Sequence, residues 1–181
     1  MERRRGMKTL TIATTLLALT SLSSLASAED APKPIADLER FVGTWKASGT
    51  LTMGKDTVKV SATWACKRVS AKAGVGCTLE LKGVPGLPVY GETDLFGYEP
   101  HSNTYHWFAV TNAGETHDHV AKVAGIDEPK LQFVYTGTQE GKPFKEVIDL
   151  TFEPGNKAMA LRAETFVAGA STSVFDMKAK K

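Results

Sequence analysis

Apolar and polar residues alternate in short runs from residue 43 to the end of the chain, and Gly, Pro, Asn and Asp separate the runs. A period of two predicts half-buried β-strands, and the residues between the runs predict tight connections. The runs predict strands at residues 45–53, 57–66, 77–82, 89–98, 104–111, 115–123, 130–137, 144–152, 157–167 and 171–178. About ten strands at this spacing indicate an all-β fold: a single antiparallel up-and-down β-barrel, without free edges and with room for a cavity.

One short helix is expected before the strands, at residues 34–40. No sustained helical period follows the segment Phe41-Val42-Gly43-Thr44-Trp45. We therefore expect an N-terminal segment with a short helix at residues 29–42 and one barrel domain at residues 43–181.

The first 28 residues contain the three parts of a secretory signal peptide in order. Three arginines and Lys8 form a basic start, residues 9–25 are apolar apart from Thr and Ser, and Ala26-Ser27-Ala28 offers small residues for cleavage before Glu29. The apolar run is too short and too rich in Thr and Ser to span about 30 Å of hydrocarbon, so no integral membrane segment is expected after cleavage. The sequence predicts a periplasmic or secreted protein.

The charge of the mature chain argues against one class of partner. The whole chain has 22 basic and 20 acidic residues, and the leader holds four of the basic and one of the acidic, which leaves 18 against 19. A near-neutral chain without a Lys/Arg cluster is not expected to bind nucleic acid, because it cannot neutralise a phosphate backbone. The remaining 153 residues are enough for a single domain with one core.

Two cysteines lie at matching positions of adjacent predicted strands. Pairing Cys66 with Cys77 places Trp64 opposite Leu79 and aligns the apolar faces of the two strands. In an oxidising compartment this register favours a cross-strand disulfide. The alternative is a pair of buried free thiols. A catalytic redox pair is not expected, because the spacing is not Cys-x-x-Cys.

Three histidines are candidate metal ligands. His117 and His119 lie two residues apart and therefore share one face of their strand. A two-residue turn at Ala113-Gly114 brings His106 to the same face, near His119. Three imidazoles on one barrel face can hold zinc or copper. A shift of the turn by one residue moves His106 to the opposite face, and the alternative interpretation is that these are polar strand residues facing solvent.

Two acidic residues, Glu92 and Asp94, alternate with apolar residues and are expected to face water. The chain contains no Gly-x-Ser-x-Gly elbow, His-Glu-x-x-His helix, phosphate-binding loop or Gly-x-Gly-x-x-Gly fingerprint. Nothing in the sequence therefore supports an enzyme, and no cofactor is expected.

The opening segment, residues 41–45, resembles the first strand of calycins, the group that includes lipocalins and fatty-acid-binding proteins. A true fatty-acid-binding protein is not expected, because no helix-turn-helix lid follows the first strand and the last strand lacks Arg-x-Tyr. The fuller resemblance is to an uncharacterised family of secreted bacterial calycin-like domains (domain of unknown function 1579), and it covers nearly the whole mature chain. It is carried by Leu38 with the opening segment, Phe96-Gly97-Tyr98-Glu99-Pro100, and Thr104-Tyr105-His106-Trp107 leading to Asn112-Ala113-Gly114. The family implies a barrel of about ten strands and no known activity.

The resemblance also suggests a role for Arg162. This residue and Glu164 share a strand face with Ala160 and Phe166, so either can project into the barrel. An inward Arg162 can bind a ligand carboxylate bidentately. In calycin-like barrels an arginine near the last strands more often stacks on the tryptophan of the first strand, here Trp45, and we favour that structural role.

Three interpretations of function follow. The first is an exported barrel that binds a small apolar or amphipathic molecule. The second is a structural or protein-interaction barrel with a filled core, and the third is a metal-binding protein or metal-dependent enzyme that uses His106, His117 and His119. The sequence gives no indication of oligomeric state. The residues expected to line the interior are Trp45, Leu51, Val60, Trp64 and Leu79, whereas Lys46, Lys59 and Glu80 are expected to face solvent.

Overall fold

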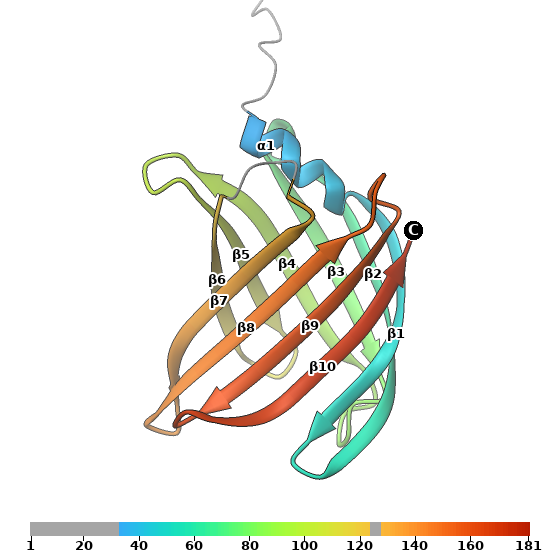
Figure 1. Cartoon of the computed structure of the whole chain (residues 1–181), viewed down its shortest axis with the longest axis vertical. Coiled ribbons are helices and arrows are strands. Elements are labelled where there is room, and N and C mark those ends of the chain that lie inside the picture. Colours follow the sequence, from blue (N-terminus) through green and yellow to red (C-terminus); the bar gives the residue numbers. More distant parts are fainter. Residues whose placement is uncertain (1–32, 124–127) are drawn as a thin grey trace, which may run out of the picture.

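The computed structural model describes residues 33–123 and 128–181, which form a closed antiparallel β-barrel (Figure 1). Each strand pairs with its neighbour in sequence, and the first strand pairs with the last, so the sheet closes without a free edge. The strands are β1 (Gly43–Met53), β2 (Asp56–Val69), β3 (Gly74–Lys82), β4 (Tyr90–Glu99), β5 (Thr104–Thr111), β6 (Thr116–Lys122), β7 (Lys130–Gln139), β8 (Lys142–Phe152), β9 (Ala158–Val167) and β10 (Ala170–Lys180). The predicted all-β up-and-down barrel is confirmed.

A short helical segment covers one end of the barrel. Helix α1 (Lys33–Asp37) continues into the 3-10 helix η1 (Leu38–Phe41), and Figure 1 shows α1 lying at the end where β1 begins. The side chains of Leu38 and Phe41 are buried, at 1% and 0% exposure. The segment is also held by polar contacts, because the Tyr105 hydroxyl donates to Asp37 at 2.8 Å and the Trp45 indole donates to the carbonyl of Phe41 at 2.8 Å.

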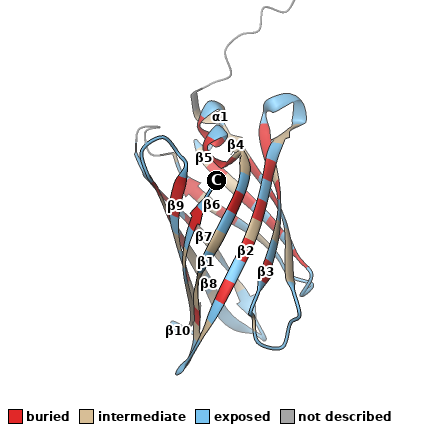
Figure 2. Cartoon of the chain, turned by 90° about the vertical axis from the view of Figure 1, so that its right-hand side faces the viewer, coloured by how far each residue is buried: buried red, intermediate tan, exposed pale blue. Residues whose placement is uncertain are grey.

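The β2–β3 pair has the register that the cysteines predict. Cys66 and Cys77 are bonded, and Trp64 lies opposite Leu79. Buried and exposed residues alternate along β2, as Figure 2 shows, because successive side chains point to opposite faces of the sheet. The predicted disulfide is confirmed.

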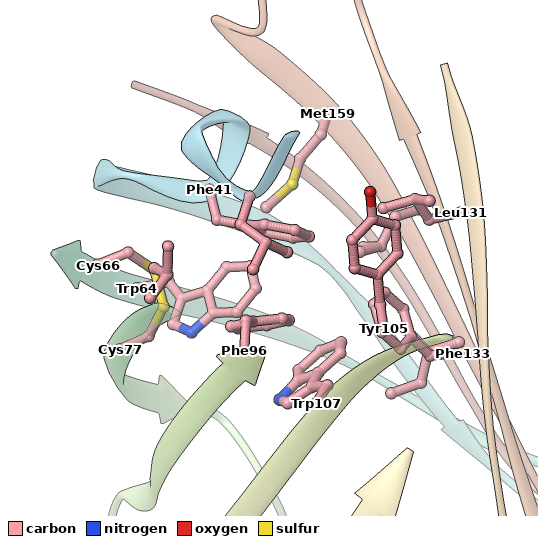
Figure 3. Packing of buried hydrophobic residues seen from close by; sticks show 14 of the residues in the cluster. Phe41, Trp64, Cys66, Cys77, Phe96, Tyr105, Trp107, Leu131, Phe133 and Met159 are labelled. Atoms are coloured by element: carbon pink, nitrogen blue, oxygen red, sulfur yellow. A yellow bond between two sulfur atoms is a disulfide. The ribbon is translucent and has the colours of Figure 1, made fainter. Parts of the chain in front are cut away.

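Aromatic rings fill the part of the barrel nearest the helix. Phe41 stacks on Phe96 with 4.4 Å between ring centroids, and Trp64 stacks on Trp107 at 5.5 Å (Figure 3). Burying such rings contributes about 1.5–3 kcal/mol each relative to leaving them exposed, so this cluster stabilises the closed barrel. Smaller side chains from β1, β2 and β3, centred on Leu51, form a second cluster.

The predicted signal peptide, residues 1–28, lies outside the described residues. Within residues 33–123 and 128–181, no helix is long and apolar enough to cross a membrane.

Candidate functional site

The inner face of the barrel changes along the barrel axis. Near α1 the inward side chains of Phe41 and Trp45 are both 0% exposed. Towards the other end, the inward residues of β4, β6, β7 and β8 are half-buried and mostly polar. We call this set the lumen cluster: Tyr90, Glu92, His117, Tyr135, Phe144 and Glu146. These six side chains point inward and yet remain partly exposed.

A carboxylate and two imidazoles meet in this region. Nε2 of His119 lies 2.7 Å from Oε2 of Glu146, and Nδ1 of His117 lies 3.4 Å from the same oxygen. We call these three residues the His–Glu trio. The histidines come from adjacent inward positions of β6, and Glu146 comes from β8, on the far side of β7. The side chain of His119 is 4% exposed, against 16% for His117 and 19% for Glu146, so the trio opens towards the lumen on one side.

Aromatic rings hold the trio in place. Tyr135 stacks on His117 with ring centroids 4.3 Å apart, and Phe144 contacts the same imidazole at 5.6 Å. Trp107 lies 5.6 Å from the ring of His119 on the other side. The absence of a side chain at Gly137 makes this packing possible, because a Cβ there would lie 2.5 Å from the Tyr135 hydroxyl. The side chains of the His–Glu trio project from strands, and the packing of these rings fixes their orientations.

Glu146 remains ionised in this setting. Burial by itself raises the pKa of Glu146, but hydrogen bonds from His117 and His119, together with their charge, outweigh burial and lower the pKa to about 2. A charged carboxylate beside two imidazoles can bind a cation.

The lumen cluster also contains a carboxyl group that is held protonated. Burial, followed by the neighbouring Asp94, raises the pKa of Glu92 well above its usual range. The Tyr90 hydroxyl donates to Glu92 at 2.9 Å, and burial raises the pKa of Tyr90 as well. The negative charge of Glu146 raises the pKa of Tyr90 and the pKa of Glu92 further. The same lumen thus holds one charged and one neutral carboxyl group.

Asp94 does not face water as the alternation suggested. Its side chain is 0% exposed, and its two oxygens accept hydrogen bonds from the indole nitrogens of Trp64 and Trp107, each at 2.7 Å. A buried carboxylate is stable only where donors satisfy it, and here two core tryptophans supply them. The expectation that Glu92 faces water is also wrong, since Glu92 lies on the same inward face.

His106 does not join the other two histidines. Three residues connect Thr111 of β5 to Glu115, and the backbone N–H of Thr111 donates to the carbonyl of Glu115 at 3.0 Å. Gly114 in this turn adopts a positive φ of 85°. This turn is one residue longer than the predicted one, so His106 pairs with Val120 and points outward. On the outer face His106 contacts Asp118, 3.0 Å from its Nδ1.

Arg162 also lies on the outer face, and it does not cover Trp45. Its guanidinium forms ion pairs with Asp176 at 2.9 Å and Glu164 at 3.3 Å. The Trp45 ring is covered by the Lys181 ammonium, 4.5 Å from the ring centroid. An outward, paired Arg162 is not positioned to hold a ligand inside the barrel.

The predicted interior positions do face inward. Trp45, Leu51, Val60 and Trp64 are buried at 5% exposure or less, and Leu79 is half-buried beside them. The three residues expected to face solvent, Lys46, Lys59 and Glu80, are exposed.

Glu146 did not emerge from the sequence patterns as a site residue. A signal for Glu146 exists in the alternation of β8, because Glu146 falls in phase with Phe144, Ile148 and Leu150. A charged residue in the apolar phase of a strand is the mark of a buried polar site.

Two solved structures share this architecture. Rv2717c from M. tuberculosis matches with a TM-score of 0.60 and 12% sequence identity, over 84% of this chain and 99% of that chain. The S-type phycobiliprotein lyase CPES from Guillardia theta matches with a TM-score of 0.52 and 8% identity, over 82% of this chain and 91% of that chain. Both are barrel proteins of the calycin-like kind, and at these identities the likeness concerns the fold. No protein-family model and no curated protein matches the chain.

Proposed function

We propose that this protein is an exported calycin-like barrel that binds a small amphipathic molecule in the end of the barrel away from α1. The observation that carries the proposal is the change in the inner face, from fully buried aromatic rings near α1 to the half-buried lumen cluster at the other end. A concave apolar wall with a few convergent polar groups is the usual form of a small-molecule site.

The chemistry of the lumen favours an amphipathic ligand over a purely apolar one. Leu79, Phe144 and Phe175 supply apolar inward surface that is only partly covered. Glu92 and Glu146, one neutral and one charged, can accept hydrogen bonds from a polar group of the ligand. A ligand with a hydrogen-bond donor at one end and an apolar body satisfies both surfaces.

The export part of the proposal rests on the leader sequence and agrees with the Cys66–Cys77 disulfide, because disulfides persist in oxidising compartments. Membership in the domain of unknown function 1579 family belongs to the same proposal and rests on the motifs given above. N-terminal sequencing of the protein recovered from its own cells, with fractionation, tests the export: the mature chain should begin at Glu29 outside the cytoplasm. A chain that retains Met1 or Met7 at its start contradicts it.

Ligand binding is tested by filling the lumen. Thr165 faces inward beside Glu146, and Thr136 is exposed on the outer face of β7. Thr165→Phe should abolish binding of an environment-sensitive apolar dye to the folded protein, and Thr136→Phe, the same change on the outside, should leave it intact. Native mass spectrometry of protein purified from its source should show a retained small molecule.

The competing function is a structural or protein-interaction barrel with a filled core. Absence of dye binding to the wild-type protein at micromolar concentrations, or equal binding by the two Phe variants, would favour it. We do not propose the three-histidine form of the metal interpretation, because His106 lies on the outer face, whereas His117 and His119 face inward.

A further inference from the structure

The His–Glu trio has the composition of a three-ligand metal site. Two imidazole nitrogens and one carboxylate, with a fourth position left for water or substrate, are a common ligand set for zinc in proteins. The three side chains offer ligand atoms that all lie within 4.8 Å of one another. From the geometry we infer that His117, His119 and Glu146 bind one zinc ion in the wall of the barrel lumen.

The spacing of the ligand atoms is close to what the ion requires. Two ligands at about 2.0–2.1 Å from a tetrahedral zinc ion lie roughly 3.3 Å apart. Nδ1 of His117 already lies 3.4 Å from Oε2 of Glu146, whereas Nε2 of His119 lies closer, at 2.7 Å, in a hydrogen bond. Zinc replaces the proton of that bond, and a small rotation of the Glu146 side chain opens the shorter distance.

The charge of the trio is also suited to a cation. Both ion pairs that Glu146 makes among the described residues are with histidine, so neither lysine nor arginine neutralises the carboxylate. A bound divalent ion supplies positive charge at this place without the need to protonate either imidazole. His117 and Glu146 are partly exposed towards the lumen, which leaves a path for the ion to enter.

The second ring nitrogen of His119 sets the expected affinity. Nδ1 of His119 is buried and has no hydrogen-bond partner among the described residues. Metal-bound histidines usually donate this N–H to an acceptor, and loss of such a partner weakens binding by about 10–100-fold. We therefore expect micromolar rather than nanomolar binding. Metal binding here does not require the amphipathic ligand proposed above.

The test is calorimetric titration of the metal-stripped full-length mature protein with zinc chloride. The wild type should bind one zinc ion per chain, and His119→Gln and Glu146→Gln should each weaken binding by roughly tenfold or more. His106→Gln is the matched control, since it makes the same change at a histidine on the outer face, and its affinity should equal that of the wild type. Thermal unfolding of each variant without metal identifies those that keep the fold.

A second measurement does not depend on the variants. X-ray absorption at the zinc edge of the loaded wild-type protein should show two imidazoles and an oxygen ligand. Absence of zinc binding by the wild type, a spectrum without imidazole, or folded variants in which His106→Gln weakens binding as much as His119→Gln would each overturn the inference. Dye binding by the wild type is measured in a separate experiment. Failure of zinc to bind contradicts the metal site alone, and failure of the dye to bind contradicts the ligand proposal alone.

Discussion

The carboxylate of Asp94 accepts a hydrogen bond from the indole nitrogen of Trp107 at 2.7 Å in the interior of the barrel. Trp64 donates to the other carboxylate oxygen at the same distance, and the two indole rings stack on each other. The three side chains come from β2, β4 and β5, so one buried acid joins three strands at the boundary between the aromatic core and the polar lumen.

Removal of this acid should destabilise the protein strongly. Asp94→Ala leaves two buried indole N–H groups without acceptors, at a cost of about 1–3 kcal/mol each. Asp149→Ala on the exposed outer face of β8 should change the free energy of unfolding by less than about 0.5 kcal/mol. Urea unfolding followed by tryptophan fluorescence measures both. Equal stability of the two variants would show that the indole hydrogen bonds are not made.

A neutral replacement of Glu92 should stabilise the protein at high pH. The folded-state pKa of Glu92 is raised by burial and by Asp94, so the folded chain binds a proton more tightly than the unfolded chain, whose ordinary value is 4.5. The stability that this provides is present below pH 4.5 and is lost as the pH rises. Glu92→Gln should therefore match the wild type near pH 4.5 and exceed it at pH 8 by about 1 kcal/mol or more.

The control for this experiment is Glu80→Gln, because Glu80 is exposed on the outer face of β3. Its stability curve against pH should overlie that of the wild type. If Glu92→Gln is less stable than the wild type at pH 8, then Glu92 is ionised in the folded protein and the assignment of a neutral lumen carboxyl is wrong.

Truncation of Trp64 tests the aromatic core. Its side chain is 5% exposed and contacts Phe41, Phe96 and Trp107. Trp64→Ala should cost about 3–5 kcal/mol, because apolar contact is lost and a cavity remains. Lys59→Ala, on the exposed face of the same strand, should have almost no effect on the denaturation midpoint. A small effect of the tryptophan change would mean that the barrel interior is not packed around it.

Reduction of the Cys66–Cys77 bond should lower the melting temperature without changing the fold. The two cysteines are 11 positions apart, and closing a loop of this size stabilises the folded state by roughly 2–3 kcal/mol in the chain-entropy estimate. Differential scanning calorimetry with and without reductant measures the shift. The double variant Cys66→Ala/Cys77→Ala should melt at a temperature that reductant does not alter, and a wild-type protein equally indifferent to reductant would contradict the prediction.

The turn between β5 and β6 shows why part of the site could not be predicted. His117 and His119 share a face at any register, because they lie on one strand, and that much follows from a period of two. The position of His106 depends on the length of one turn, and the difference between a two-residue and a three-residue loop reverses the face. Glu146 reaches the histidines across β7, a relationship that no local pattern contains.

The number of strands, their order, the closed barrel, the opening helix and the Cys66–Cys77 pairing were determined by the sequence alone. Period-two alternation, turn residues and matched cysteines act over a few residues or between adjacent strands, so they can be read along the chain. Only the tertiary structure decided which charged residues are buried. Asp94 lies inside because indoles from two other strands reach it, and Lys181 rather than Arg162 covers Trp45 because the chain end meets β1 there. Burial of a polar group requires a partner, and the partners of Asp94 are side chains of two other strands, β2 and β5, whose meeting inside the barrel is not contained in the pattern of any one strand.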